Sequence, residues 1–142
     1  MTPKEIVEAW HVTWRKDVAL ANKLYLADNV KVLLPGAKAI VGWEAANAHF
    51  LRVAAGCNAE TLVVNNDYTV FVCEGNKVAR RFRFDMENTD GERCEMFVFN
   101  FYIVENGKIV HFEEHFDTYA RAQNSDLSVY RKDHDPRAWI ID

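Results

Sequence analysis

The sequence lacks a long apolar run and a surplus of basic residues. No apolar stretch approaches the roughly 20 residues that cross a bilayer. The opening MTPKEIVEAW carries acids where a signal peptide needs uncharged residues. The formal net charge is −4, whereas nucleic acids and anionic membranes are bound through clustered lysine and arginine. We therefore expect no nucleic-acid partner and no membrane partner.

Cysteines are few and dispersed. Cys57, Cys73 and Cys94 are odd in number and have no CxxC spacing. This pattern is typical of free thiols in a reducing compartment, so we expect a cytoplasmic protein. Small buried thiols are favoured over a catalytic cysteine.

Cofactor and metal motifs are also missing. The chain has no GxGxxG, no phosphate-cradling GKT or GKS, no GxSxG and no HExxH. His111 and His115 are expected on one strand face near Glu113, but no third ligand has diagnostic spacing. The tail run DHD at 133–135 is only a weak metal pattern. We therefore expect no cofactor and no metal.

The residues that are present indicate one α+β domain over 1–142, with a core at 1–120 and a tail at 121–142. Thr2 and Glu5 form a capping-box pattern before the first apolar stripe. Helical spacing predicts helices over 3–15, 17–26 and 43–55. Alternating runs between turn signals predict strands over 30–34, 61–64, 68–73, 77–87, 93–104 and 108–118.

Turn signals also predict which side chains share a face of the sheet. Asn106-Gly107 is a two-residue turn signal that should pair Glu105 with Lys108, and we expect a second two-residue turn at Asp90-Gly91. Side chains alternate between faces. One face should then carry Phe82, Phe84, Met86, Phe97, Phe99, Phe101, Ile103, Val110, Phe112, Glu114 and Phe116. The other should carry Arg81, Arg83, Asp85, Asn100, Tyr102, His111, Glu113 and His115.

The aromatic face contains a single carboxylate, Glu114. Burial among phenylalanines penalises its ionised form, so either its pKa rises or it finds a donor. General acid–base catalysis near neutral pH uses such a carboxyl group. The alternative is that Glu114 lies near the rim, reaches water or pairs with an arginine. Arg80, Arg81 and Arg83 are interpreted as part of a mixed-charge sheet face.

The helices should close an apolar pocket over this face. His11 and Trp14 could line it from the first helix, and His49 lies beside Phe50 on the third. For each of these, an ordinary structural role is the alternative. The predicted pocket residues are Trp10, His11, Trp14, His49, Phe50, Phe82, Phe84, Phe97, Phe99, Phe101, Phe112 and Phe116.

Three segments carry a family resemblance over about residues 3–120: VEAWHVTWRKDVALANKLYLADNVKVLLPG, VGWEAANAHF and NGKIVHFEEHFDT. Together they resemble the nuclear-transport-factor-2-like superfamily, in particular its SnoaL-like branch. The resemblance implies a cone-shaped barrel: a strongly curved antiparallel or mixed sheet, closed by about three N-terminal helices over an apolar pocket. It also implies a homodimer through the outer sheet face. Fold does not settle activity in this superfamily.

The same resemblance implies a catalytic position. Polyketide cyclases of this type use an acidic residue on the last strand, and counting from the Gly-Lys-Ile of the turn places that position on Glu114. Epoxide-hydrolase-like members add an Arg-x-Asp, which Arg83-Phe84-Asp85 matches. In the predicted register Arg83 and Asp85 face away from Glu114, unless a bulge or a three- or five-residue loop intervenes. Asp117 is a lesser candidate near the end of the strand.

These features predict a small-molecule-binding protein with an apolar, oxygenated ligand. An isomerase, cyclase, dehydratase or hydrolase using Glu114 for proton transfer is one hypothesis. A non-catalytic binding module is the second, and an assembly domain working through the outer sheet face is the third. The apolar end of the tail, at 139–141, could cover the pocket mouth, dock on a partner subunit or fray.

Overall fold

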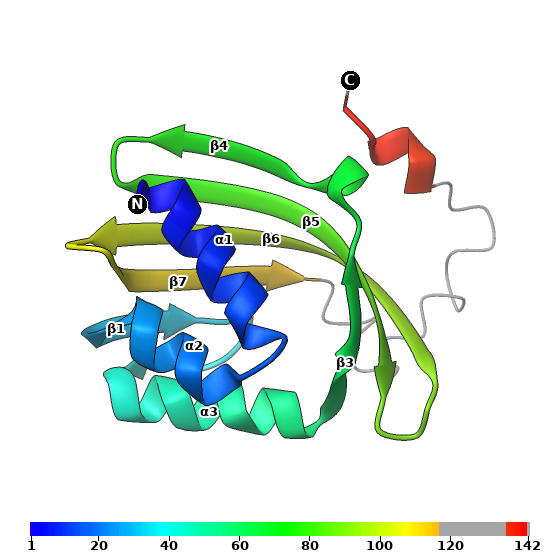
Figure 1. Ribbon diagram of the computed structural model, residues 1–142, viewed down its shortest axis with the longest axis horizontal. Coiled ribbons are helices and arrows are strands. Elements are labelled where there is room, and N and C mark those ends of the chain that lie inside the picture. Colours follow the sequence, from blue (N-terminus) through cyan, green and yellow to red (C-terminus); the bar gives the residue numbers. More distant parts are fainter. Residues whose placement is uncertain (117–135, 142) are drawn as a thin grey trace.

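Three helices pack against a curled, unclosed sheet of seven strands in the computed structural model, which describes residues 1–116 and 136–141 (Figure 1). The helices are α1 (Pro3–Trp14), α2 (Val18–Tyr25) and α3 (Trp43–Ala55). The strands are β1 (Leu26–Leu33), β2 (Ile40–Val41), β3 (Cys57–Val64), β4 (Val70–Glu74), β5 (Lys77–Asn88), β6 (Arg93–Glu105) and β7 (Lys108–Phe116). This is the predicted α+β arrangement.

The helix ends follow from local chemistry. The Thr2 backbone N–H donates to Glu5 Oε2 at 2.6 Å, and the Glu5 N–H donates to Thr2 Oγ1 at 3.3 Å, which completes the predicted capping box. The Asp17 carboxylate caps α2 by accepting from the Leu20 N–H at 2.9 Å. None of the helices in the described part of the chain has the length and apolar character that a membrane crossing requires.

Buried Asn22 ties the three helices together. Its Oδ1 accepts from Trp10 Nε1 of α1 at 3.2 Å, and its Nδ2 donates to Asn47 Oδ1 of α3 at 3.0 Å. Its backbone carbonyl accepts from Trp43 Nε1 at 3.0 Å. One fully buried polar residue therefore fixes the layer of helices that covers the sheet.

The sheet is mixed. The strand order is β2-β1-β7-β6-β5-β3, with β1 parallel to β7 and the other pairs antiparallel. Strands β3 and β4 both pair with β5, along different parts of its length. Helix α1 crosses the sheet and packs against β5, β6 and β7, while α3 runs along the β1 end (Figure 1). These contacts leave the inner face of β5–β7 between α1 and α3.

The β6–β7 hairpin contains a bulge that the sequence did not reveal. Glu105 pairs with Lys108 as predicted, and the turn residue Asn106 adopts φ 51°. The register then shifts by one residue at Val110, so Tyr102 lies opposite Phe112. The predicted register, which placed Phe101 in that position, is wrong from this point onward.

The β5–β6 connection differs from the prediction in the same way. Glu87 pairs with Arg93, and Asn88 faces Glu92 through a 2.9 Å backbone hydrogen bond. Three residues therefore form the loop instead of two, with Gly91 at φ 78°. The bulge at Val110 reverses the faces of β6 relative to β7, and the longer loop reverses them relative to β5. Strands β5 and β7 keep their predicted faces, and β6 alone is reversed.

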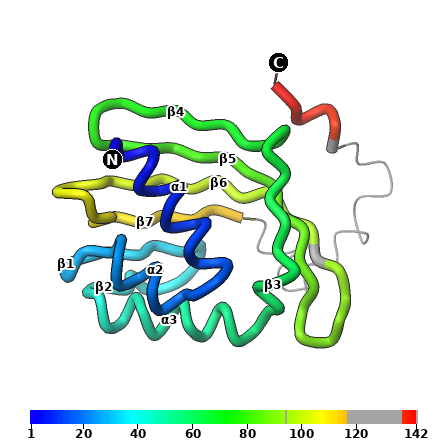
Figure 2. Tube along the Cα trace, in the orientation of Figure 1, coloured from blue at the N-terminus to red at the C-terminus, as the bar shows by residue number. Residues whose placement is uncertain are grey.

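The short C-terminal helix η3 (Pro136–Trp139) rests on the outer face of the sheet. The Trp139 ring lies 4.9 Å from the Phe97 ring, and Arg81 Nη2 donates to the Trp139 carbonyl at 2.6 Å. Figure 2 shows this segment beside the far ends of β3 and β4, away from the helices. Trp139 packs on the outer face and is not among the residues that line the cavity, so it does not cover the pocket as one of the three expectations for the tail proposed.

Candidate functional site

A cavity of about 550 Å³ lies between the helices and the inner face of β5–β7. Its walls combine α1, α3, β3 and β4 with the three long strands. Apart from Phe97, Phe99 and Phe101, every residue of the predicted pocket set lines it. These lining residues are Trp10, His11, Trp14, His49, Phe50, Phe82, Phe84, Phe112 and Phe116.

The predictions for Phe97, Phe99 and Phe101 are wrong. They pair with Arg83, Arg81 and Ala79 of β5, and the reversal of β6 turns them to the outer face. Phe99 is 51% exposed. Met96 and Val98 line the cavity in their place.

Three polar side chains form a row across the inner face. Arg80 of β5 pairs with Asn100 of β6, and Asn100 pairs with Glu114 of β7. Arg80 and Glu114 both line the cavity, separated by two strand spacings of about 5 Å each. Arg81 and Glu113 lie on the outer face, as predicted. The prediction that Asn100 and Tyr102 share that face is wrong, because the reversal of β6 turns both side chains inward.

Asn100 connects Glu114 to a buried hydroxyl. Its Nδ2 donates to Tyr102 Oη at 2.7 Å and lies 3.4 Å from Glu114 Oε2. Tyr102 Oη lies 2.6 Å from His11 Nε2. Among the described residues of β5–β7, Glu114 is the one carboxylate on the inner face, as predicted.

The protonation of this network follows from its burial. Burial, followed by the charges of Arg80 and Arg15, holds the pKa of His11 well below its ordinary value, so the imidazole is neutral. Burial also raises the pKa of Tyr102, which therefore keeps its proton. Because Asn100 donates to the phenol oxygen, the Tyr102 hydroxyl is free to donate to His11 Nε2. This assignment leaves the His11 proton on Nδ1.

Arg80 is a functional candidate that the sequence prediction missed. It is 6% exposed and lines the cavity, with its guanidinium 4.1 Å from the centre of the Phe82 ring. Extending the alternation of Phe84 and Phe82 by one step would have placed Arg80 on the inner face. Asn100 and Tyr102 carried no such signal, because their faces depend on the bulge and the loop.

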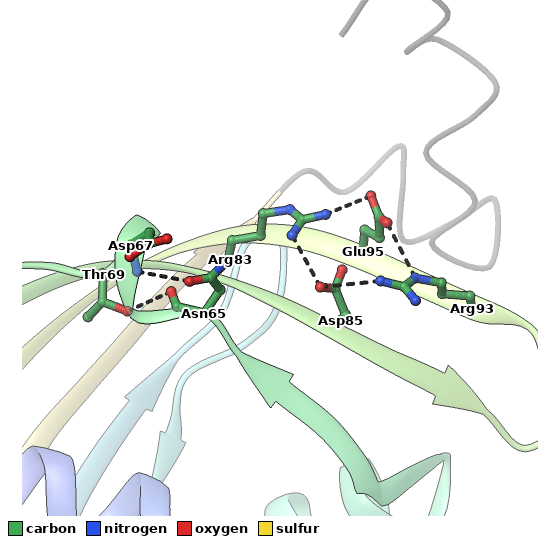
Figure 3. Close-up of polar contacts among 7 residues, drawn as sticks. All are labelled: Asn65, Asp67, Thr69, Arg83, Asp85, Arg93 and Glu95. Atoms are coloured by element: carbon green, nitrogen blue, oxygen red, sulfur yellow. Dashed lines mark hydrogen bonds and ion pairs between the residues drawn. The ribbon is translucent and has the colours of Figure 1, made fainter. Parts of the chain in front are cut away.

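Arg83 and Asp85 lie on the outer face, as the sequence predicted. Arg83 contacts Asp85 at 3.1 Å and Glu95 at 3.0 Å, and Arg93 approaches the same two carboxylates at 3.5 and 3.4 Å (Figure 3). These four residues form the outer ion cluster. The three-residue loop did not bring Arg83 and Asp85 inward, because it was β6 that reversed. Asp117 lies outside the described residues.

The histidine pair of β7 is also on the outer face. His111 and His115 hydrogen-bond to Glu113 at 3.1 and 2.8 Å, and these bonds lower the pKa of the Glu113 carboxyl, the one from His115 most. Within residues 1–116 and 136–141, no three histidine, cysteine, aspartate or glutamate side chains converge as a metal site would require. The run at 133–135 lies outside the described residues.

Similarity to known proteins supports the fold. The family model of the SnoaL-like domain matches residues 4–112. A protein described as a SnoaL-like polyketide cyclase from Jannaschia sp. CCS1 is 15% identical, with a TM-score of 0.73 over 88% of this chain and 92% of that one. An epoxide hydrolase of the LEH-like type from M. tuberculosis is 17% identical, with a TM-score of 0.68 over 84% and 85%. The protein TerC, co-crystallised with polyporic acid, is 15% identical, with a TM-score of 0.71 over 85% and 95%.

At these identities the solved structures establish the fold alone, and no sequence of a curated protein matches. The match to the family model covers more than half of the chain and ends two residues before Glu114. It includes α1, α3 and the strands that carry Arg80 and Asn100. The chain therefore belongs to the SnoaL-like domain family.

Proposed function

We propose that this chain is a cofactor-independent enzyme that binds an apolar, oxygenated small molecule and uses Glu114 for proton transfer. The observation that carries the proposal is the position of the Glu114 carboxyl in an otherwise largely apolar cavity wall, 3.4 Å from the amide nitrogen of Asn100. Phe112 and Phe116 flank it on β7. A low-dielectric wall strengthens the interaction of a carboxylate with a developing positive charge or an acidic proton.

The proposed step is general acid–base catalysis. The Glu114 carboxylate removes a proton from a carbon next to a carbonyl, or from a water molecule, and the resulting carboxylic acid returns it elsewhere on the substrate. Isomerisation, cyclisation, dehydration and epoxide hydrolysis all contain such a step. The Asn100 amide orients the carboxylate, and its own position is fixed by Tyr102 and His11.

A matched pair of variants tests this role. Glu114→Gln and Glu113→Gln each remove one carboxylate from adjacent positions of β7, the first from the inner face and the second from the outer. Wild type and both variants are screened in parallel against β-dicarbonyl, hydroxy-carbonyl and epoxide substrates, with product formation followed by chromatography and mass spectrometry. We expect Glu114→Gln to lose about 10²- to 10⁴-fold in turnover, and Glu113→Gln to lose little. Equal turnover by wild type and Glu114→Gln would remove Glu114 from the mechanism and favour a binding module.

We further propose a homodimer through the outer sheet face. The support is the set of large apolar side chains that this face exposes: Val63, Val72, Phe99 and Trp139 are 58%, 67%, 51% and 46% exposed. Large apolar side chains that stay exposed on one face of a sheet favour a partner that covers them. The cytoplasmic location stays a prediction from the dispersed cysteines.

A further inference from the structure

Arg80 places a positive charge in the wall of the cavity. Its partner on β4 is Phe71 and its partner on β6 is Asn100, both of which belong to the inner face. The side chain is 6% exposed and lies between the aromatic rings of Phe71 and Phe82, at 5.6 and 4.1 Å. Arginine remains charged at neutral pH even where burial lowers its pKa, as burial does here.

No side chain in the described part of the chain forms a salt bridge with this charge. Neither Nε nor Nη1 of Arg80 has a hydrogen-bond partner among those residues. The neighbouring His11 is neutral and Arg15 adds a second positive charge. The Tyr102 hydroxyl and the exposed carboxylate of Glu8, which also lines the cavity, offset only part of these two charges. This end of the cavity is therefore positive.

Burying a charge without a counter-ion is costly, and proteins normally pair such groups. Arg83, three residues along the same strand and almost equally buried, has two carboxylates within 3.1 Å. Two arginines of one strand are thus buried to a similar degree, and only Arg83 has a salt bridge in the part of the chain that the structure describes. Arg80 instead lines the cavity with the Tyr102 hydroxyl beside it and without a salt bridge among the described residues.

We infer that Arg80 is the anchor for an anionic oxygen of the ligand, a carboxylate or an enolate. This inference rests on the proposed ligand-binding function and narrows the substrate class to apolar molecules that carry such a group. The anion would lie at the Arg80 end of the polar row, because the Glu114 carboxylate repels it from the other end. The two-strand separation, about 10 Å, then sets the apolar, reacting part of the ligand beside Glu114.

Two probes of the same shape test the inference: naphthalene-2-carboxylate and naphthalene-2-carboxamide. Their dissociation constants are measured at pH 7 by titration calorimetry with the full chain. We expect wild type to bind the carboxylate about 10- to 100-fold more tightly than the amide, as for a hydrogen bond to a charged group. Arg80→Met should reduce this ratio to near one while changing amide binding less than about threefold.

The controls separate this inference from the proposed function. Arg81→Met removes the adjacent, outward-facing arginine and should leave the ratio unchanged. Glu114→Gln should keep the ratio, or raise it, even where it abolishes turnover. If circular dichroism shows that Arg80→Met does not fold, Arg80→Gln is used instead. It should likewise reduce the carboxylate-to-amide ratio to near one.

A wild-type ratio near one would overturn the inference while leaving a ligand cavity in place. A ratio that survives both Arg80 substitutions would assign the anchor to another residue and overturn it as well. Failure of both probes to bind at millimolar concentration would contradict this inference and the ligand-binding cavity together. Full turnover in Glu114→Gln with an intact ratio would instead contradict only the proposed catalytic role.

Discussion

Both faces of strands β5–β7 carry arginines and carboxylates, but the two faces differ in whether these charges form ion pairs. On the outer face, Arg83 and Arg93 share the carboxylates of Asp85 and Glu95, so positive and negative groups neutralise each other at about 3 Å (Figure 3). On the inner face, Asn100 of β6 lies between Arg80 of β5 and Glu114 of β7, so the two charges are two strands apart. The difference shows that ion pairing organises the outer side of the sheet, whereas the inner face keeps Arg80 and Glu114 apart.

The apolar residues of the two faces differ as well. Those of the inner face, such as Phe112 and Val98, are covered by helices or line the cavity. Phe99 of the outer face stays half exposed in the single chain. Within residues 1–116 and 136–141, no side chain covers Phe99 further, which is why we propose a partner surface here.

The largest expected effect concerns this exposed apolar face. Phe99→Glu should raise the dissociation constant of the proposed homodimer by on the order of a hundredfold, because a charge would be buried at the interface centre. Light scattering during size-exclusion chromatography measures the change. The control is Leu51→Lys, which charges an exposed residue of α3. A wild-type chain that is monomeric at high micromolar concentration would contradict the proposed dimer.

The next effect compares two buried arginines of one strand. Arg83→Met removes the buried cation shared by Asp85 and Glu95 and leaves them only the exposed Arg93, so it should lower the free energy of unfolding by about 2 kcal/mol. Arg80→Met removes a buried charge that has no salt bridge, and should leave stability unchanged or raise it by about 1 kcal/mol. Urea denaturation of both variants measures the difference. Equal losses in the free energy of unfolding would show that Arg80 stabilises the fold as much as Arg83 does, which would contradict this prediction.

The smallest effect is a pH dependence that arises on the inner face. The pKa of His11 is lowered in the folded chain, so below about pH 6.5 the unfolded state binds a proton that the folded state does not. Stability should therefore fall as the pH falls through this range, by at most about 1.4 kcal/mol per pH unit from this group. His11→Gln should remove that part of the slope. Urea midpoints at pH 5 and pH 7.5 give the measurement, and identical slopes in both proteins would show that His11 is not the source.

Local signals were enough to predict most of the elements. The bounds of α3 match the predicted range, because Gly42 and Gly56 flank an apolar stripe at helical spacing. The Glu105–Lys108 pair follows from the Asn106-Gly107 turn. Strand β1 begins earlier than predicted, directly after α2, and its parallel pairing with β7 joins segments about 80 residues apart that no local pattern connects.

The site was predictable only where alternation ran without interruption. Glu114 and Phe112 were placed on the inner face because β7 is regular beyond Val110. The outward turn of Phe97 and Phe99 was not predictable, since β6 carries apolar residues on both faces and its hydrophobic pattern favours neither register strongly. A sheet face that is both aromatic and exposed misleads any argument that places the more apolar side inward.

The bulge at Val110 also limits how residue roles can be carried between relatives. It lies between the Asn106-Gly107 turn and Glu114, so counting from the turn reaches the cavity face only in chains that keep the extra residue. In a relative without it, the residue at the same count would point to the opposite side, and the acid would stand one place nearer the turn. An alignment gap misplaced by one position would thus exchange an inner carboxylate for an outer one, such as Glu113 for Glu114. To compare sites across this family, the bulge of the β6–β7 hairpin must therefore be aligned first, and the residue types only afterwards.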